Sequence, residues 1–341
     1  MTFWLTSSMS ACLSEGATMR AIRLVAYGDA IDGVEVHDLP EPPPPGPGEV
    51  LIQMCYAPVN VSDLMVVWGV YSWKPQPPEV LGNEGAGEVL AVGEGVTGLV
   101  PGMPVAVPFM ARSWRERLVV PASLAVALPA DADLQQSSMA TINAVTASML
   151  LDDYVDLQPG DAVVFNAGTS GLAQWLVGLA RGRGLRAIAL VRKEADIARV
   201  QAIGCEVVLV DEDGVASAPA LRGLNVRLAL DGVGGASARR LAELLAVGGS
   251  LVAYAAASHE PMEVSAQHLI FKRINVHGFF EGHPENASRV PGVLNRLKEF
   301  LRPNGIRQPV AAVYPMAQVK EAVAHALKGG KVLLSFGGDR Q

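Results

Sequence analysis

From about residue 136 to residue 270, short apolar runs alternate with segments of helical length, and this alternation limits the possible folds more than any other feature. The run DAVVFNAG precedes TSGLAQWLVGLARGRG, RAIALVR precedes KEADIARVQAIG, and RLALDGVGG precedes ASARRLAELLAVGG. Short apolar runs are typical of buried strands, and longer amphipathic segments are typical of helices. Strands that alternate with helices build a parallel sheet with helices on its faces. The sequence therefore predicts an α/β fold with a doubly wound parallel sheet.

The segments on either side of this region predict a second, β-rich domain. Residues 20 to about 135 hold short β-type runs separated by Pro and Gly clusters such as EPPPPGPGE, a pattern typical of a compact barrel or sandwich. After about residue 270, strand-like runs return in NVHGFF, VAAVYPM and KVLLSF. We therefore predict that residues 136–270 are inserted into a catalytic domain made of residues 19–135 and 271–341, and that residues 1–18 are a disordered extension.

Composition excludes several classes of protein. Of the 341 residues, 50% are hydrophobic and 18% are charged, and the formal net charge is −7. Disordered chains have fewer apolar residues and more net charge, and nucleic-acid-binding proteins carry clusters of Lys or Arg. Crossing a bilayer requires about 20 consecutive apolar residues, and the chain has no such stretch. We expect neither a nucleic-acid partner nor a membrane partner.

Cysteine and histidine usage bears on metals and on redox compartment. The three cysteines, Cys12, Cys55 and Cys205, lie far apart and give neither a disulfide framework nor a CxxC metal site. The six histidines are also scattered, whereas zinc needs three or four ligands at one centre. The sequence predicts no metal site and a reducing compartment, of which the cytoplasm is the expected one.

The first apolar run of the predicted sheet leads into a turn of small residues, Ala167 to Ala173, that opens a helix. Backbone N–H groups at such a helix start can hold a pyrophosphate. An ordinary strand-to-helix turn would look similar, but the surrounding strand-helix-strand pattern favours a Rossmann dinucleotide site. The candidate cofactor-binding residues in the turn are Thr169, Ser170, Gly171 and Leu172.

The second strand of the predicted sheet distinguishes the two nicotinamide cofactors. In NAD sites this strand ends in an acidic residue that binds the ribose 2′-OH, but here it ends in Arg192 and Lys193. Two cations suit the 2′-phosphate of NADPH. A solvated basic pair at a helix start is the alternative interpretation. Because no carboxylate precedes Glu194 in this turn, we predict that Arg192 and Lys193 bind NADPH.

Three segments of the first lobe point to a known family. Asn60 opens the segment NVSD, Tyr71 closes the segment WGVY, and Asn83 lies in the segment GNEG. These segments resemble the N-P-S-D, G-x-Y and G-N-E-G motifs of mitochondrial-type 2-enoyl thioester reductases, which are zinc-free medium-chain dehydrogenases/reductases. The resemblance covers residues 19–337. It implies a GroES-like catalytic domain beside the Rossmann domain.

Zinc alcohol dehydrogenases of the same superfamily place their metal ligands where this chain has other residues. Asn60 occupies the position of the first Cys ligand, Asn83 occupies that of the His ligand, and the stretch from Thr141 to Asn143 contains no Cys. The resemblance therefore implies a zinc-free enzyme.

The resemblance also implies roles for individual residues. Tyr71 matches the family's proton donor, and a phenol in an apolar pocket can protonate the α-carbon or hydrogen-bond the enolate. The alternative interpretation of Tyr71 is a packed aromatic residue, which the flanking motif disfavours. For Asn143 and Thr146 the alternative is a helix cap and a back-bonded helix residue. Asn60 and Thr146 are the other expected catalytic residues. Further expected cofactor-binding residues are Asn143, Tyr254, Phe279, Phe280 and Lys331.

The expected activity is NADPH-dependent reduction of the C=C bond of a trans-2-enoyl thioester carried by CoA or acyl carrier protein. A zinc-free quinone oxidoreductase of the zeta-crystallin type is the alternative, although neither Tyr71 nor Asn83 is needed to reduce a quinone. A non-catalytic NADPH sensor is a third possibility. Val61 and Phe280 replace the family's Pro and Trp, so we expect a different acyl pocket. The family further implies a homodimer joined through the Rossmann domains.

Overall fold

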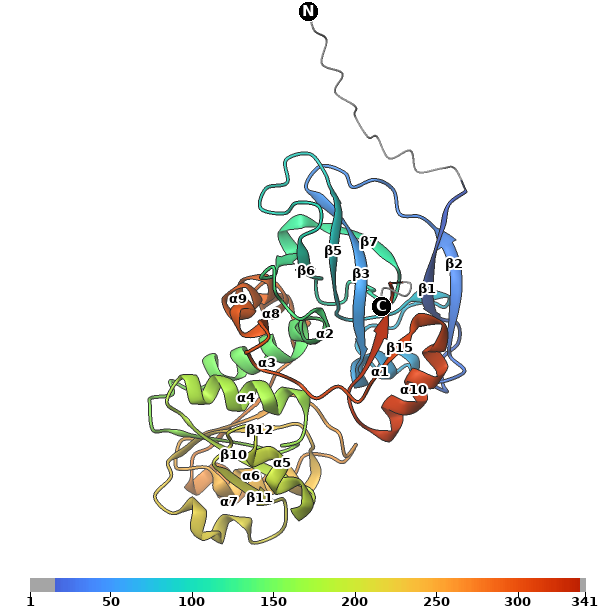
Figure 1. Ribbon diagram of the computed structural model, residues 1–341. Helices are drawn as coiled ribbons and strands as arrows, with labels where there is room; N and C mark the ends of the chain where they lie inside the picture. The colour runs from blue at the N-terminus through green and yellow to red at the C-terminus, as the bar shows by residue number, and fades with distance from the viewer. Residues whose placement is uncertain (1–15, 338–341) are drawn as a thin grey trace, which may run out of the picture.

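The computed structural model describes residues 16–337, which form two lobes, with the β-rich lobe uppermost in Figure 1 and the parallel-sheet lobe below it. The extension expected over residues 1–18 lies outside the described residues, apart from residues 16–18. Within the described chain, every helix is too short or too polar to cross a membrane.

The lower lobe is built on a six-stranded sheet in which all neighbouring strands are parallel. Its spatial order is β11 (Val207–Val210), β10 (Arg186–Val191), β9 (Ala162–Phe165), β12 (Val226–Asp231), β13 (Ser250–Ala253) and β14 (Asn275–Gly278). Its connecting helices are α4 (Gly171–Gly182), α5 (Ile197–Gln201), α6 (Gly235–Leu244) and α7 (Ala266–Phe271).

Alternate side chains of β9 enter two separate hydrophobic clusters. Val163 and Phe165 pack with residues of α4, whereas Ala162 and Val164 pack with residues of α6. Since successive side chains of a strand point to opposite faces, helices cover both faces of this sheet. The predicted doubly wound parallel sheet is confirmed.

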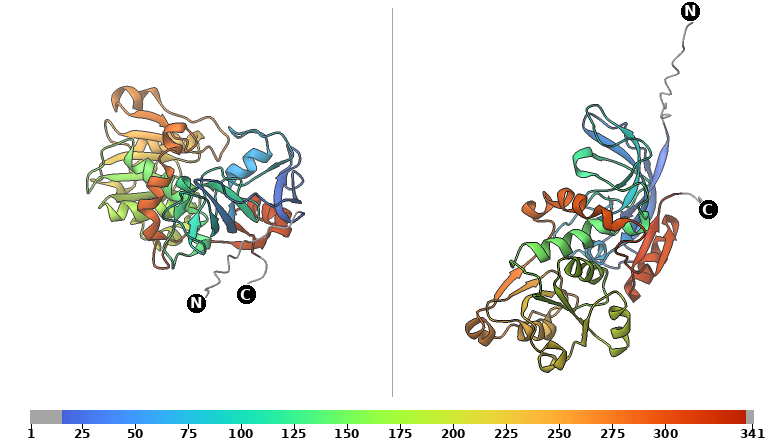
Figure 2. Two further views of the ribbon diagram at one scale, coloured as in Figure 1. Left: turned by 90° about the horizontal axis from the view of Figure 1, so that it is seen from above. Right: turned by 60° about the vertical axis from the view of Figure 1, so that its left-hand side comes forward.

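This lobe extends further along the chain than the sequence pattern indicates. Strand β14 pairs with β13, and α9 (Val290–Leu297) shares a hydrophobic cluster with α3 (Ala140–Asp152) and α4. Figure 2 shows α3 in green and α9 in orange side by side where the lobes meet. The boundary expected at residue 270 is therefore too early, because hydrophobic periodicity identifies a strand but not the sheet that it joins.

The upper lobe holds a seven-stranded and a three-stranded sheet. The larger has the order β15 (Ala312–Pro315), β16 (Val332–Ser335), β3 (Glu49–Val59), β5 (Ala86–Val92), β6 (Pro104–Ala106) and β8 (Val126–Ala127), and β7 (Arg117–Pro121) also pairs with β3. The smaller has the order β2 (Val34–Pro40), β1 (Thr18–Leu24) and β4 (Glu79–Val80). Short strands separated by turns therefore build a β-rich lobe, as predicted.

The remaining helices are short. They are α1 (Val61–Val67), α2 (Leu134–Ser137), α8 (Pro284–Ala287) and α10 (Val319–Lys328), together with 3-10 turns at Ala122–Leu124, Glu194–Asp196, Val215–Ser217, Pro219–Leu221, Lys298–Leu301 and Met316–Gln318. Strand β16, near the end of the chain, runs antiparallel to β3 with Val332 opposite Val59. This register brings the start of β16 to the end of β3, where α1 begins.

Candidate active site

The pairing of β3 with β16 places Asn60 beside Lys331. The Lys331 ammonium donates to Asn60 Oδ1 over 2.5 Å, and Asn60 Nδ2 donates to Glu84 Oε1 over 2.9 Å. The other oxygen of Glu84 accepts the backbone N–H of Ile142, in the first turn of α3, over 2.8 Å. That N–H has no partner within the helix, so Glu84 ties the catalytic lobe to α3.

Two carboxyl groups in this network are fully buried. Asp63 accepts the backbone N–H groups of Asn60 and Asn83 over 2.9 and 3.0 Å. Burial raises the pKa of Asp63 to about 7 and also raises the pKa of Glu84, whereas burial lowers the pKa of Lys331. The positive charge of Lys331 favours the ionised form of both acids. Ion pairing as well as hydrogen bonding therefore stabilises the charges of this network.

Tyr71 follows α1 and lies near enough to Asp63 for the two groups to interact electrostatically. The rings of Tyr71 and Phe280 pack edge to face, with 6.0 Å between ring centroids and 79° between planes. Burial raises the pKa of Tyr71 to about 12, and the carboxyls of Asp63 and Glu281 add to the shift. The phenol therefore stays protonated at neutral pH and can act as an acid.

Thr146, on α3, lies next to the residue that follows Phe280. Its hydroxyl donates to Glu281 Oε2 over 3.3 Å. Asn143 precedes Thr146 by three residues and so lies on the same face of the helix. Its side-chain N–H donates to Gln308 Oε1 over 2.6 Å. Helix α3 thus carries Asn143 and Thr146 as a pair of polar side chains facing neighbouring segments.

The Gly-rich turn between β9 and α4 faces Asn60 and Lys331 across a cavity of about 430 Å³. Thr169, Ser170 and Gly171 line the cavity from the turn. The Ser170 hydroxyl accepts the backbone N–H of Ala173 over 3.2 Å and caps α4. The cavity therefore lies between the two lobes, with a helix N-terminus on one wall and an ammonium group on the other.

Close packing explains the small residues of this turn. A Cβ atom at Gly171 would lie 2.3 Å from Gln308 Oε1 and 2.9 Å from Asn143 Nδ2. A Cβ atom at Gly168 would lie 3.0 Å from the carbonyl oxygen of Leu190. Glycine is therefore the residue that fits at both positions. The N–H groups of Gly168 and Ser170 already donate to the carbonyl oxygens of Leu190 and Ala167, so a pyrophosphate at this turn would use the other N–H groups of the helix start.

Arg192 and Lys193 are exposed and directly follow β10, which is the neighbour of β9 in the sheet. Neighbouring parallel strands end at the same edge, so this basic pair lies at the same edge of the sheet as the turn. Arg199, on α5, lines the same cavity as Gly171. The donor set of helix N-terminus and cations fits an NADPH molecule.

Not every predicted cofactor residue points into this cavity. The side chains of Leu172 and Phe279 belong to the hydrophobic core, so only the backbone of Leu172 can serve a ligand at the turn. Tyr254 lies over the β12–α6 turn, where a Cβ atom at Gly232 would be 2.4 Å from its hydroxyl oxygen. Burial raises the pKa of Tyr254, which keeps this phenol uncharged.

Sequence patterns missed three residues that the fold brings to this region: Glu281, Gln308 and Arg199. Gln308 accepts a hydrogen bond from the side-chain amide of Asn143. It lies in a segment in which the sequence shows no motif. Glu281 had one available signal, because it is an acidic residue directly after the matched Phe279-Phe280 pair. Only the hydrogen bond from Thr146 shows that this acid belongs to the site.

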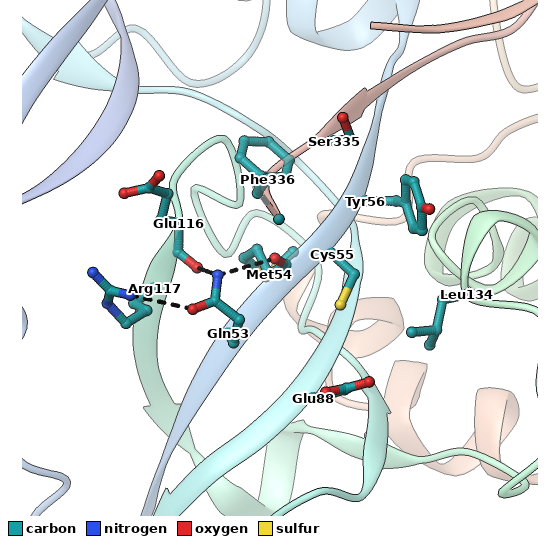
Figure 3. Close-up of a pocket in the computed structure, with 11 residues that line it drawn as sticks. Gln53, Met54, Cys55, Tyr56, Glu88, Glu116, Arg117, Leu134, Ser335 and Phe336 are labelled. Atoms are coloured by element: carbon teal, nitrogen blue, oxygen red, sulfur yellow. Dashed lines mark hydrogen bonds between the residues drawn. The ribbon is translucent and has the colours of Figure 1, made fainter. Parts of the chain in front are cut away.

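A second cavity, of about 410 Å³, lies elsewhere in the upper lobe. Figure 3 shows it beside β3, with Gln53 hydrogen-bonded to the backbone of Glu116 and to Arg117. None of the site residues expected from the sequence lines it. Among residues 16–337, no three His, Cys, Asp or Glu side chains gather in a way that could hold a metal ion.

A parallel sheet with a glycine-containing turn at a helix N-terminus, facing a β-rich lobe across a cavity, is the arrangement of a dinucleotide-dependent oxidoreductase. Residues 46–130 match the family described as alcohol dehydrogenase GroES-like domain, and residues 171–299 match the family described as zinc-binding dehydrogenase. The mitochondrial enoyl-acyl-carrier-protein reductase of Homo sapiens is 33% identical over 94% of this chain and 89% of its own length. The Rattus norvegicus protein is 32% identical over 95% and 89%. The chain belongs to the medium-chain dehydrogenase/reductase superfamily and, within it, to the family of the mitochondrial enoyl-acyl-carrier-protein reductases.

Solved structures share the fold. The complex of Etr1p with NADP and crotonyl-CoA matches with a TM-score of 0.81, at 22% identity, over 94% of this chain and all of that one (100%). An NADPH:quinone reductase from Bacillus thuringiensis, described as putative in its own name, matches with a TM-score of 0.82, at 23% identity, over 94% of this chain and 99% of that one. The fold alone therefore does not distinguish an enoyl acceptor from a quinone.

The comparison corrects the expected compartment. The sequence predicted a cytoplasmic location, but the human, rat and Dictyostelium discoideum relatives are mitochondrial proteins by name. The prediction is wrong because a small number of cysteines indicates only that disulfides are not used. That property does not distinguish one reducing compartment from another.

Proposed function

We propose that this protein reduces the C=C bond of a trans-2-enoyl thioester with NADPH, and that Tyr71 is the acid of the reaction. The observation that carries the proposal is the position of Tyr71, whose ring packs against Phe280 and whose phenol interacts with the buried Asp63 and Glu281, in a chain of the enoyl reductase family. When bound, NADPH supplies the hydride for the β-carbon. Tyr71 then protonates the α-carbon, which completes the saturated thioester.

Residues on both sides of the inter-lobe cavity hold the cofactor. The backbone of the turn from Thr169 to Leu172 binds the pyrophosphate, and Arg192 and Lys193 bind the 2′-phosphate. Asn143, Tyr254 and Phe280 border the nicotinamide. Lys331, which is also a cavity residue, either reaches a phosphate or holds Asn60 in place. Its hydrogen bond to Asn60 favours the second role.

Asn60 and Thr146 position the reactants. Asn60 is clamped between Lys331 and Glu84, so its orientation is set before any ligand arrives. Thr146 is held by Glu281 on the same face of α3 as Asn143. Groups that are oriented in advance lower the entropic part of the barrier.

Reduction of crotonyl-CoA by the purified protein tests this function, with NADPH consumption as the signal and 1,4-benzoquinone as the competing acceptor. Tyr71→Phe should lower kcat for crotonyl-CoA by about 10²- to 10⁴-fold, the usual contribution of general acid catalysis, and leave the Kd of NADPH unchanged. Tyr56→Phe is the matched control, because Tyr56 lines the other cavity. Reduction of the quinone alone, at the same rate in Tyr71→Phe, would establish the quinone reductase alternative.

We also infer that two copies of the chain form a homodimer through the edge of the six-stranded sheet. Strand β14 ends the sheet, and its residues are exposed. The adjoining helix α7 presents Ile270 and Phe271, which are 65% and 75% exposed. Exposed apolar side chains beside a sheet edge are typical of an interface. A mitochondrial 2-enoyl thioester reductase from Candida tropicalis, with the same fold, is a heterodimer.

A further inference from the structure

Glu281 has no role in the reaction proposed above, yet it is a buried acid with an unpaired carboxyl oxygen. It follows Phe280, is 4% exposed, and accepts the hydroxyl of Thr146 at Oε2 over 3.3 Å. Its other oxygen, Oε1, is buried and has no hydrogen-bond partner in the structure. Buried side-chain oxygens are nearly always paired, because an unpaired one loses its hydration without compensation. Oε1 therefore needs a partner that a ligand or a water molecule would supply.

The surroundings of Glu281 favour its uncharged form. Glu84 repels a negative charge on Glu281, a charge on Glu281 also acts on Tyr71, and the rings of His283 and Phe280 pack edge to face. Lys331 donates to Asn60, and Asp63 adds a further carboxyl to the cluster. Burial, followed by repulsion from Glu84, raises the pKa of Glu281 well above its usual range. A buried carboxyl whose one hydrogen-bond donor is a neutral hydroxyl favours its protonated form.

The position of that proton follows from the hydrogen bonds. Oε2 is the acceptor of the Thr146 hydroxyl, so the proton belongs on Oε1. An uncharged carboxyl then presents an O–H donor that has nothing to donate to. Thr146 lies one helical turn after Asn143, whose amide nitrogen would be 2.9 Å from a Cβ atom at Gly171 in the turn, and Phe280, next to Glu281 in the chain, packs against Tyr71.

We propose that Glu281 donates a hydrogen bond from Oε1 to a carbonyl oxygen of a bound ligand, either the thioester of the substrate or the carboxamide of the nicotinamide. The proposal rests on the function proposed above and adds a residue to it. Glu281 is not deprotonated in the reaction, because its proton stays on Oε1. Tyr71 supplies the proton for the α-carbon.

The two ligands predict different effects. A donor on the thioester oxygen would stabilise the negative charge that develops there after the β-carbon accepts hydride, and such donors act strongly in a dry site. A donor on the carboxamide would orient the nicotinamide ring and would act on cofactor binding. The two ligands can therefore be distinguished: a hydrogen bond to the thioester affects kcat/KM, and a hydrogen bond to the carboxamide affects the Kd of NADPH.

The experiment compares Glu281→Leu, which removes the donor, with Glu281→Gln, which keeps one in its side-chain N–H. NADPH Kd is measured by fluorescence, and kcat and KM are measured with crotonyl-CoA. For the thioester, Glu281→Leu should lose about 10²-fold in kcat/KM with an unchanged Kd; for the carboxamide, Kd should rise about tenfold or more. Glu281→Gln should retain most of either property. Glu285→Leu is the matched control, because Glu285 is an exposed acid on α8.

A pH profile adds a test that a merely structural role would not pass. In the wild type, either kcat/KM for crotonyl-CoA or the affinity for NADPH should decline as pH rises through the raised pKa of Glu281, because ionisation removes the O–H donor. Glu281→Gln should not show that decline. Suppose that Glu281→Leu folds with a Tm at or above that of the wild type and has the same Kd, kcat and KM as the wild type. In that case Oε1 binds only a buried water, and the proposal is wrong. If the wild type binds NADPH but reduces no enoyl thioester, the proposed function fails, and the Kd comparison alone decides the role of Glu281.

Discussion

At the scale of single residues, the site depends on three carboxyl groups placed where water cannot reach them. Asp63, Glu84 and Glu281 are all buried, and Lys331 is the one ammonium that interacts with Asp63 and Glu84 in the described chain. Removing a carboxylate from water costs far more than one ion pair returns. The cost is limited in two ways. Backbone N–H groups donate to Asp63, a backbone N–H and the Asn60 amide donate to Glu84, and burial favours the protonated form of Glu281.

This arrangement predicts that stability falls as pH rises from the mildly acidic range to neutrality. Native Asp63 has a pKa of about 7 and the native pKa values of Glu84 and Glu281 are raised, whereas unfolded carboxyls titrate near about 4. The native state therefore binds more protons than the unfolded state in this window, and the free energy of unfolding decreases with pH. Thermal unfolding from about pH 5 to about pH 8 should show a falling Tm.

Glu281→Gln isolates the contribution of one of these groups. Its Tm should fall less steeply across the same range, because the amide does not titrate. Asp131 and Asp213 are exposed acids with lowered pKa values. They make the free energy of unfolding rise with pH, but only below the pKa that they have in the unfolded chain. An equally steep fall of Tm in Glu281→Gln would show that Glu281 does not take up a proton on folding.

At the scale of elements, the proposed cofactor site lies at the ends of neighbouring strands. β9 supplies the turn, and β10 supplies Arg192 and Lys193. Parallel pairing of β10 with β9 brings these segments to the same sheet edge. The order of strands thus turns two separate sequence signals into one binding site.

The basic pair after β10 predicts the cofactor preference. Arg192→Ala combined with Lys193→Ala should raise the Kd of NADPH by about 10- to 100-fold, the usual loss when charge-assisted hydrogen bonds to a phosphate are removed, and should leave the Kd of NADH nearly unchanged. Arg186→Ala is the control, because Arg186 is an exposed arginine at the other end of the same strand. Equal losses for both cofactors would place the 2′-phosphate elsewhere.

At the scale of the whole molecule, the proposed active site is shared between lobes. Asn60 and Lys331 come from the upper lobe, whereas Thr169 to Gly171 come from the lower lobe. Glu84 links the lobes through the backbone of Ile142. A change in the angle between the lobes would alter the cavity, so residues that hold this angle influence ligand binding without contact with a ligand.

The proposed homodimer is tested at the same scale. Ile270→Glu combined with Phe271→Glu should convert a dimer to a monomer in light scattering, because four charges cannot be buried at a two-fold interface without partners. Val100→Glu is the control, since Val100 is an exposed apolar residue of the upper lobe (55%). A wild-type protein that is already monomeric at micromolar concentration would contradict the inference.

The sequence by itself determined the local elements and the family. Alternating apolar runs predicted the parallel sheet, small residues predicted the turn before α4, and the segments around Asn60, Tyr71 and Asn83 predicted the enoyl reductase resemblance. These signals are readable because each depends on neighbours within a few residues, through backbone conformation and side-chain periodicity.

Only the tertiary structure decided which distant residues meet. The register of β16 on β3 pairs Lys331 with Asn60, the approach of the segment after β14 to α3 pairs Glu281 with Thr146, and β14 joins the lower sheet beyond the expected boundary. Contacts of this kind depend on strand register and on how helices pack. Periodicity within one segment carries no information about either, because the same apolar pattern fits any sheet or helix face that can bury it.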